Sequence, residues 1–364
     1  EDYNRIISEI EETGNTTAKT RLELSAKAYT HTAEYDMCIA TYMRRAAELN
    51  EKLFASFDLV QSLRYGENPH QTAKFYASEE RVPYSLATAR QLNGKEMSYN
   101  NIQDANAALN IVREFSEPFA VGLKHMNPCG AAIGADIVEA WTKAYEADKV
   151  SIFGGIVAVN REVTKEVAEL MKPIFLEIIM APSFTPEALE VLCTKKNLRL
   201  LEVDMGELSK PQTQYVSVNG GLLVQQLDTE TKEVVADMCV TDRRPTAKEL
   251  EDMNLGWRIV KHVKSNAIVA VKDGHTVGVG AGQMNRVGSA EIALKQAKAA
   301  GFTSDLVLAS DGFFPFDDTV TLAEQYGVTA LVQPGGSVRD EDSVKRANEF
   351  GMTMLVTGMR HFKH

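Results

Sequence analysis

The sequence predicts an α/β protein with two lobes, and three observations lead to this class. Strand-like apolar runs alternate with amphipathic helix-like segments from about residue 58 onward, which is typical of largely parallel central sheets. The run AIVAVKDGHTVGVGAG places Asp273-Gly274 between two alternating segments, which indicates a β-hairpin. The 364 residues, 44% of them hydrophobic, suffice for two cores of ordinary domain size.

The elements can be assigned in chain order. Residues 1–55 carry apolar residues at three- and four-residue spacing, which predicts a helical lead-in. Apolar runs then predict strands at 119–123, 152–159, 177–181, 267–271, 306–310, 330–333 and 353–357. Amphipathic segments predict helices at 103–115, 135–147, 164–170, 187–193, 289–300, 320–326 and 340–350. A connecting loop is expected around residue 218, which gives a first lobe at 56–212 and a second at 213–364.

The two predicted lobes show no repeat of residues. The order of strand, polar pair and small-residue helix start nevertheless occurs in both. The helix-like opening without an initiator methionine suggests that the chain is part of a longer one.

Composition excludes several classes of protein. The net charge of −11 argues against non-specific binding of nucleic acid or acidic membranes, because such binding needs clustered Lys and Arg. The sequence has no apolar run of the roughly 18 to 20 residues that a membrane helix needs, and its acidic start is unlike a targeting peptide. The four cysteines are dispersed without a CxxC pair, so we expect reduced thiols in a soluble, cytoplasmic protein.

A Lys-His pair ends the strand predicted at 119–123, within the run AVGLKHMNPCGAA. The turn formers NPCG directly after it favour a turn that brings Lys124 and His125 toward one ligand. Strand ends are also where α/β proteins place their ligands. Taken alone, the pair is more often a solvated strand end, so the other motifs decide between the two interpretations.

Glycine-rich and aromatic segments accompany other predicted strands. The runs FGGI (153–156), GVGAGQMNR (278–286) and PGGSVRD (334–340) allow close approach of the backbone to a ligand, although such turns are common. The run SDGFFPFDDT (310–319) brackets three Phe with carboxylates, which packing alone could explain. The end GMRHFKH could be a frayed cationic tail.

Taken together, these motifs resemble the 5-aminoimidazole-4-carboxamide ribonucleotide (AICAR) formyltransferase part of the bifunctional enzymes that also carry inosine monophosphate (IMP) cyclohydrolase. The resemblance rests on LRYGENPHQ, NNIQDANAA, KHMNPCGAA, FGGIVAVN, SNAIVAVKDGHTVGVGAGQMNRV, SDGFFPFDD and RHFKH, which run in family order from about residue 60 to the end. The first 50 or so residues resemble the end of the cyclohydrolase part. The resemblance therefore implies two tandem lobes similar to cytidine deaminase, without cyclohydrolase activity in this chain.

The implied reaction transfers the formyl group of 10-formyltetrahydrofolate, the co-substrate, to the 5-amino group of AICAR. His125 matches the catalytic histidine of the family, and imidazole suits removal of the amine proton. Lys124 matches the lysine that would stabilise the oxyanion or assist the leaving nitrogen, and its charge would favour a neutral neighbouring imidazole. Asn266 matches an asparagine that orients the reacting amide.

The resemblance also implies substrate contacts, each at a matching position. The phosphate would be bound by Arg64, Tyr65 and Arg360. The base or its carboxamide would be contacted by Phe313 and His364, and the pterin by Asp318. Further substrate contacts would come from Asn101, Gly154, Glu177, Lys196 and Arg286. Two positions depart from the pattern. Glu177 and Thr319 stand where some relatives carry aspartate and asparagine, which changes the reach of each side chain. A basic cluster of Arg64, Lys124, Lys196, Arg286 and Arg360 is expected to converge on the anionic ligands.

The resemblance implies a homodimer with active sites at the subunit interface. Some members bind a monovalent cation, potassium, near the positions of Ser265 and Asp311, and this stays open here; no other metal is expected. Two alternatives also stay open. A zinc nucleotide deaminase would need a P-C-x-x-C segment and an H-x-E, neither of which occurs. A non-catalytic nucleotide- or folate-binding module would have no need of the Lys124-His125 pair.

Overall fold

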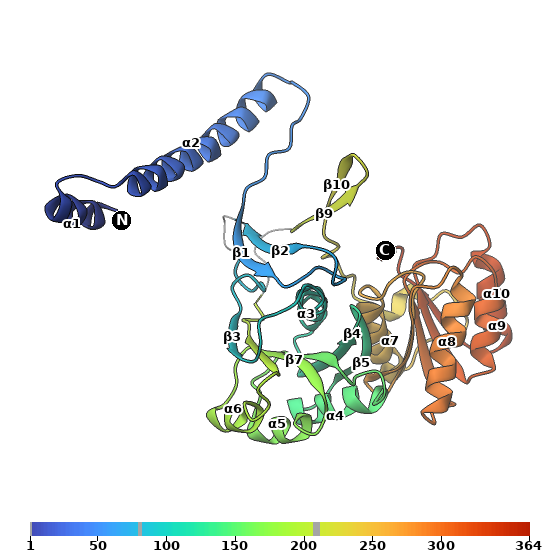
Figure 1. Ribbon diagram of the computed structural model, residues 1–364. Coiled ribbons are helices and arrows are strands. Elements are labelled where there is room, and N and C mark those ends of the chain that lie inside the picture. The colour runs from blue at the N-terminus through green and yellow to red at the C-terminus, as the bar shows by residue number, and fades with distance from the viewer. Residues whose placement is uncertain (1, 79–81, 207–211) are drawn as a thin grey trace. The chain divides into compact units, whose positions relative to one another are not determined.

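The structure is a computed structural model that describes residues 2–78, 82–206 and 212–364 (Figure 1). The chain divides into two units. The first unit comprises residues 1–59 and 76–80, and the second comprises residues 60–75 and 81–364. The domain boundaries at 55 and 212 that the sequence suggested stay predictions.

The first unit is dominated by helices α1 (Tyr3–Thr13) and α2 (Ala18–Ala46). Gly14 ends α1 in the left-handed conformation, with φ of 78°, and the side chain of Thr17 caps α2 by accepting the Thr20 amide. Helices are therefore present in the lead-in predicted for residues 1–55, but they end at residue 46. Strands β1 (Phe57–Leu63) and β2 (Ala73–Ser78) form a separate two-stranded sheet.

The second unit is built on one mixed sheet in the order β15-β14-β13-β11-β12-β5-β4-β6-β7-β8-β3. Its strands are β3 (Arg90–Asn93), β4 (Phe119–Lys124), β5 (Asn127–Ile133), β6 (Gly155–Val159), β7 (Leu176–Ala181), β8 (Arg199–Glu202), β11 (Ile268–Lys272), β12 (His275–Gly280), β13 (Leu306–Ser310), β14 (Val328–Gln333) and β15 (Thr353–Val356). Its helices are α3 (Tyr99–Val112), α4 (Ile137–Ala147), α5 (Lys165–Met171), α6 (Pro186–Leu192), α7 (Ala247–Val260), α8 (Arg286–Ala299), α9 (Asp318–Glu324) and α10 (Asp340–Glu349), with a short 3₁₀ turn η1 (Ala236–Met238).

The sheet contains the same topology twice. In the first half, β4 pairs antiparallel with both β5 and β6, and β7 and β8 then follow in parallel. In the second half, β11 pairs antiparallel with both β12 and β13, and β14 and β15 then follow in parallel. Helices also alternate with the strands in the same order, α3 to α6 in one half and α7 to α10 in the other. The structure thus shows a duplication that the residues alone do not reveal.

The two halves share one core. Strands β5 and β12 lie antiparallel, with Ala132 opposite His275, and join the halves into a continuous sheet. Side chains on one face of the sheet, such as Val121 and Val269, pack with α3 and α7 in a single cluster. The other face packs against α4 to α6 in the first half and against α8 to α10 in the second. Alternation along each strand therefore sends successive residues to different helix layers.

The predicted strands and helices are present with small shifts of their ends, and the α/β class is confirmed. The expectation of a largely parallel sheet is wrong, because each half begins with a tight hairpin that reverses the chain. The loop expected around residue 218 is wrong as well. Strands β9 (Thr213–Val218) and β10 (Gly221–Gln226) form a hairpin there, and Asn219-Gly220 between them is a strong hairpin-turn signal. Helix α7 was missed, although Thr246 and Glu249 form a capping box at its start. Whether each half resembles cytidine deaminase stays a prediction.

Candidate functional site

The candidate site lies where the end of β4 meets the end of β12. A hollow of about 370 Å³ is lined there by Lys124, His125 and Asn127 from the first half and by Val279 and Ala281 from the second. The antiparallel pairing of β5 with β12 causes this meeting, since the start of β5 lies beside the end of β12. The halves therefore contribute to one site.

Lys124 is held at the edge of this hollow. Its Nζ donates a hydrogen bond to the carbonyl oxygen of Phe153 at 2.5 Å. The next residue, Gly154, has φ of 71°, and a Cβ placed on it would lie 3.5 Å from the Phe175 ring and 3.7 Å from the Lys124 amine. Glycine at this position therefore suits the left-handed backbone, while a Cβ there would only be in ordinary contact with its neighbours.

His125 lies in a turn that differs from the expected one. The turn formers Asn127 to Gly130 were expected to reverse the chain, but they form part of β5. The reversal occurs one step earlier, at His125 and Met126, because Lys124 pairs with Asn127 across a two-residue hairpin. Pro128 is tolerated inside the strand beside a register shift near Leu123. His125 is thus exposed at the tip of a hairpin, directly after Lys124 in the chain.

Asn127 connects this turn to the segment that carries Asn266. Its Nδ2 donates to the carbonyl of His125 at 3.0 Å, and its Oδ1 accepts the amide of Lys264 at 3.0 Å. The side chain of Asn266 is in turn fixed, since Oδ1 accepts from Arg286 at 2.9 Å and Nδ2 donates to the Gln283 carbonyl at 3.0 Å. The three residues expected to be catalytic are therefore linked through Asn127, which sequence reasoning did not single out.

Arg286 is buried and held by protein groups, and its assignment as a substrate contact stays a prediction. It is 6% exposed and forms a buried ion pair with Asp311, while the same guanidinium donates to Ser310 and Asn266. Ser265 also donates to Asp311, at 2.5 Å. The guanidinium therefore orients Asn266 from inside the protein and neutralises the Asp311 carboxylate.

The C-terminal residues are bound to the site, so the alternative of a frayed tail is wrong. Lys363 exchanges two hydrogen bonds with Ser265, and the amide of His361 donates to the Asp311 carbonyl at 3.0 Å. Burial and the charge of Lys264 lower the pKa of Lys363 to about 8. Lys363 was missed, because nothing in the sequence distinguishes it from its cationic neighbours.

The other predicted substrate contacts are distributed over several segments. Arg64 lies over the Tyr65 ring. Arg360 lies over the Phe362 ring, and the ring centroid of His364 lies 5.9 Å from that of Phe362. The side chains of Lys196 and Asp318 are exposed, and Phe313 is 36% exposed. Asn101 is buried in a capping box with Ser98, and Glu177 accepts from Arg199 at 2.8 Å. None of these contacts joins two members of the expected basic cluster. The expected convergence of the basic cluster stays a prediction.

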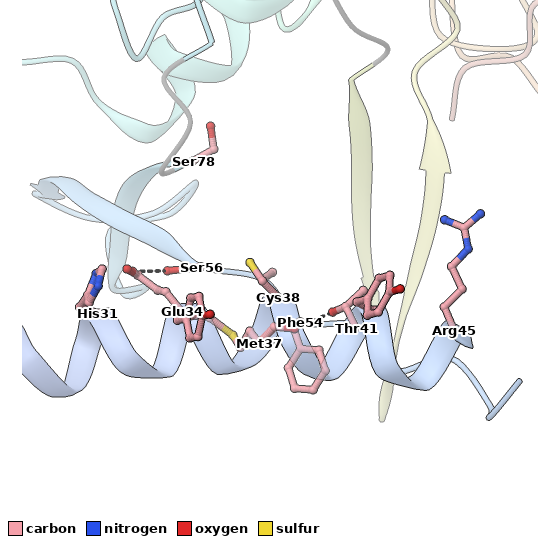
Figure 2. Close-up of a pocket in the computed structure, with 12 residues that line it drawn as sticks. His31, Glu34, Met37, Cys38, Thr41, Arg45, Phe54, Ser56 and Ser78 are labelled. Atoms are coloured by element: carbon pink, nitrogen blue, oxygen red, sulfur yellow. Dashed lines mark hydrogen bonds between the residues drawn. The ribbon is translucent and has the colours of Figure 1, made fainter. Parts of the chain in front are cut away.

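A second hollow, of about 800 Å³, occurs in the first unit (Figure 2). Side chains from one face of α2, among them Glu34 and Cys38, line it together with residues 54–56 and Ser78. Polar contacts among its lining residues include a hydrogen bond from Ser56 to Glu34 at 3.3 Å and one from Thr41 to the Met37 carbonyl at 2.8 Å. None of the predicted site residues lines it, so the candidate site is the hollow at Lys124.

The described residues offer neither a cluster of metal ligands nor a membrane-spanning helix. In residues 2–78, 82–206 and 212–364, no three or more His, Cys, Asp and Glu side chains gather in a way that could hold a metal ion. Burial raises the pKa of the Cys129 thiol to about 12, and its Sγ lies 3.3 Å from the Gly122 carbonyl. Across the same described ranges, no helix has the length and apolar character needed to span a membrane.

Comparison with known proteins identifies the family. The model of the "AICARFT/IMPCHase bienzyme" family matches residues 1–296. The protein named bifunctional purine biosynthesis protein PurH from Bacillus cytotoxicus is 56% identical over 367 aligned residues, which cover all of this chain and 71% of that protein. The chain belongs to the AICARFT/IMPCHase bienzyme family. PurH proteins of Anoxybacillus flavithermus and Bacillus subtilis match over the same shares of each chain, at 56% and 54% identity.

Membership of the AICARFT/IMPCHase family confirms the family of bifunctional enzymes that the ordered motifs predicted. The relatives carry a name that places them in purine biosynthesis, in agreement with the predicted pathway. The family name joins two activities, and the match at residues 1–296 extends over both helices of the first unit and over the second unit as far as α8. The family alone therefore does not separate the formyltransferase from the cyclohydrolase.

Proposed function

We propose that this chain transfers the formyl group of 10-formyltetrahydrofolate to the 5-amino group of AICAR, giving formyl-AICAR and tetrahydrofolate in IMP biosynthesis. The observation that carries the proposal is the Lys124-His125 pair at a hollow, linked through Asn127 to the segment of Asn266. We also infer that each half has a cytidine deaminase-like fold, as its strand order suggests, and that the protein acts in the cytoplasm.

The chemistry sets three requirements for the site. The amine nitrogen of AICAR is a weak nucleophile, so its proton must leave as the new C–N bond to the formyl carbon forms. The tetrahedral oxyanion then needs a nearby positive charge or hydrogen-bond donor. Finally, the bond between the formyl carbon and the folate nitrogen breaks, and that nitrogen takes up a proton. His125 accepts the amine proton, Lys124 stabilises the oxyanion, and Asn266 orients the reacting group.

The substrate-binding assignments are part of the same proposal. Arg64 and Arg360 are exposed guanidinium groups available to a phosphate. Phe313 and Asp318 lie in the segment after β13, where an aromatic ring and a carboxylate suit a heterocycle and an aminopyrimidine edge. For Arg286 we now propose that it fixes Asn266 instead of contacting substrate.

A homodimer would complete the site. In one chain, Arg64, Lys124 and Arg360 each have a separate contact, with the Tyr65 ring, the Phe153 carbonyl and the Phe362 ring. A second copy that supplies the missing cations would balance the charge of the bound phosphate and folate. Sedimentation at assay concentration should therefore show a dimer, and a fully active monomer would overturn this part of the proposal. A bound potassium ion stays a prediction.

The cyclohydrolase activity of the family is a separate question. The expectation that this chain lacks it stays a prediction, because the family match does not divide the two activities. Conversion of formyl-AICAR to IMP by the purified chain would show that expectation to be wrong.

The test of the proposed function is a steady-state formylation assay that follows tetrahydrofolate release. The wild-type chain should require both AICAR and 10-formyltetrahydrofolate. Removal of a general base lowers a rate by about 100- to 10,000-fold, so His125→Ala should lower kcat by that amount. Asp273→Asn, at the equivalent position of the second half, should leave kcat unchanged, and Arg64→Ala should raise the Michaelis constant for AICAR.

Two other outcomes would favour the alternatives. Tight AICAR binding by a wild-type chain that transfers no formyl group would support a non-catalytic binding module. Stoichiometric zinc together with nucleotide deamination would support a deaminase. Either result would overturn the formyltransferase proposal.

A further inference from the structure

The turn that presents His125 has an unfavourable backbone for its residues. His125 and Met126 have φ of 54° and 61°, so both central residues of the two-residue hairpin lie in the left-handed region. This is the type I′ pattern, which strongly favours Asn-Gly, Asp-Gly or Gly-Gly. A residue with a Cβ is disfavoured there, because the side chain crowds its own carbonyl. The turn therefore needs contacts from outside itself.

One of these contacts comes from a carboxylate on α3. Oδ1 of Asp104 accepts the amide of Met126 at 2.8 Å. The Asp104 side chain is partly buried; burial raises its pKa, while the Met126 hydrogen bond and His125 oppose that rise. Asn127 holds the other side of the turn through the His125 carbonyl. The two hydrogen bonds fix adjacent peptide groups and so define the turn.

The second half of the molecule contains the same arrangement. Asp273 and Gly274 form its hairpin turn, with φ of 53° and 76°. Asp252 on α7 accepts the Asp273 and Gly274 amides at 3.1 and 2.8 Å. Asp104 and Asp252 are each the sixth residue of a 14-residue helix that starts with a capping box. The carboxylate is thus a duplicated feature, found in one half with a favourable turn sequence and in the other with an unfavourable one.

We propose that Asp104 is a positioning residue, whose carboxylate holds the His125-Met126 turn in the conformation that presents His125 to the hollow lined by Lys124 and Asn127. The proposal deepens the formyltransferase function and rests on it for its catalytic consequence. In the second half, Asp-Gly adopts the turn by itself, so Asp252 adds stability only. In the first half, the same hydrogen bond decides whether the histidine is in place.

The test compares Asp104→Ala, Asp104→Asn and the matched control Asp252→Ala. A hydrogen bond to a charged acceptor is worth about 10- to 100-fold in a conformational equilibrium, so Asp104→Ala should lower kcat by that factor with a smaller change in the Michaelis constant for AICAR. Asp104→Asn keeps an oxygen acceptor and should stay within about fivefold of wild type. Asp252→Ala should lose stability to a similar extent but keep kcat.

A second variant separates turn conformation from general damage. Met126→Gly removes the Cβ at one left-handed position, so it should restore a large part of kcat when added to Asp104→Ala. Equal loss of kcat in Asp104→Ala and Asp252→Ala would overturn the proposal, and so would a full rate in Asp104→Ala. If Asp104→Ala does not fold, Asp104→Asn becomes the deciding variant. A loss of kcat in Asp104→Asn as large as that in His125→Ala would also overturn the proposal.

The histidine NMR spectrum gives a readout that needs no turnover. The Cε1–Hε1 signal of His125, assigned with His125→Gln, should shift or broaden in Asp104→Ala and stay unchanged in Asp252→Ala. If the wild-type chain transfers no formyl group, the proposed function fails, yet this signal still decides whether Asp104 holds the turn. An unchanged His125 signal in Asp104→Ala would overturn the positioning role.

Discussion

The two halves of the sheet have the same topology but different hairpin turns, Lys124-His125-Met126 in one and Lys272-Asp273-Gly274 in the other. Each turn is bound by a carboxylate from the preceding helix. The second turn carries the residues that its backbone favours, whereas the first carries residues that the same backbone disfavours. Unfavourable backbone is retained where function requires it, so the difference points to the first turn as the place of chemistry.

The halves also meet through equivalent residues. Glu114 and His262 each lie two residues beyond the end of the corresponding helix, α3 or α7, and they contact each other at 3.0 Å. Lys261 donates to the same carboxylate at 2.7 Å, and its side chain is 1% exposed. Thr231 donates to the other carboxylate oxygen. One position of the duplicated scaffold thus carries an acid in the first half and a base in the second.

The largest loss of stability is expected when the negative charge of Glu114 is removed. Glu114→Gln leaves the ammonium of Lys261 buried without a counter-charge, which costs about 3–5 kcal/mol in free energy of unfolding. Chemical denaturation followed by circular dichroism measures the loss. The surface ion pair of Lys165 and Glu169 serves as a control, and Glu169→Gln should change stability by less than about 1 kcal/mol. A similar small change in Glu114→Gln would contradict the role of the buried pair.

Acid should weaken the same contact between the halves. Burial opposes ionisation of Glu114, but hydrogen bonds and charge from His262 and Lys261 outweigh it and lower its pKa to about 2. Because this pKa is lower in the folded than in the unfolded chain, Glu114 stabilises the fold fully above the unfolded value near 4.5. This stabilisation, at most about 3 kcal/mol in free energy of unfolding, is lost as pH falls toward 2. Burial also lowers the pKa of His262, so the decline should start below about pH 6.5.

Denaturation midpoints measured from pH 7 to pH 3 test this sign. The free energy of unfolding should fall throughout the range, and Glu114→Gln should flatten its lower part. Stability that rises on acidification would show the assigned shifts to be wrong.

Smaller losses of stability, equal in the two halves, are expected from substitutions at glycines that have the same place in each half. A Cβ on Gly130 would lie 2.0 Å from the Ala144 carbonyl oxygen, and one on Gly278 would lie 1.9 Å from the Ala293 carbonyl oxygen. Each glycine is the fourth residue of its strand and lets a helix pack closely on the sheet. Gly130→Ala and Gly278→Ala should each cost about 1–3 kcal/mol, as overpacking does. Thermal unfolding of both variants checks this, and an effect in one half alone would argue against equivalent packing.

Much of the fold could be predicted from local patterns. The apolar runs at 306–310 and 353–357 and the helix pattern at 340–350 closely match β13, β15 and α10, because burial on a repeating face imposes the period. The β9–β10 hairpin was also predictable, because Asn219-Gly220 is a sequence typical of a two-residue hairpin turn, although a loop was expected there. The duplication showed in the sequence only as a shared order of strand, polar pair and helix start. Its antiparallel hairpins could not be predicted, since the residues of the two halves have diverged.

The site was predicted only in part. Motif resemblance selected Lys124, His125 and Asn266, which the structure links through Asn127. The turn itself was misplaced, because Asn-Pro-Cys-Gly is a typical turn sequence and His-Met is not. Asp104 is separated from its partner Met126 by a helix turn, a loop and a strand, so no local pattern connects them. Arg286 illustrates the same limit, since its pairing with Asp311 is a tertiary contact.

Transferring the second turn into the first tests the central claim most directly. The double variant His125→Asp/Met126→Gly places the favourable pair in the catalytic hairpin. It should be at least as stable as wild type, by up to about 1–2 kcal/mol from relief of the left-handed backbone, and should lose formyl transfer by at least about 100-fold. Denaturation and the formylation assay on one preparation give both values. A variant that is less stable than wild type, or one that keeps the wild-type rate, would contradict the claim that the first turn sacrifices stability for chemistry.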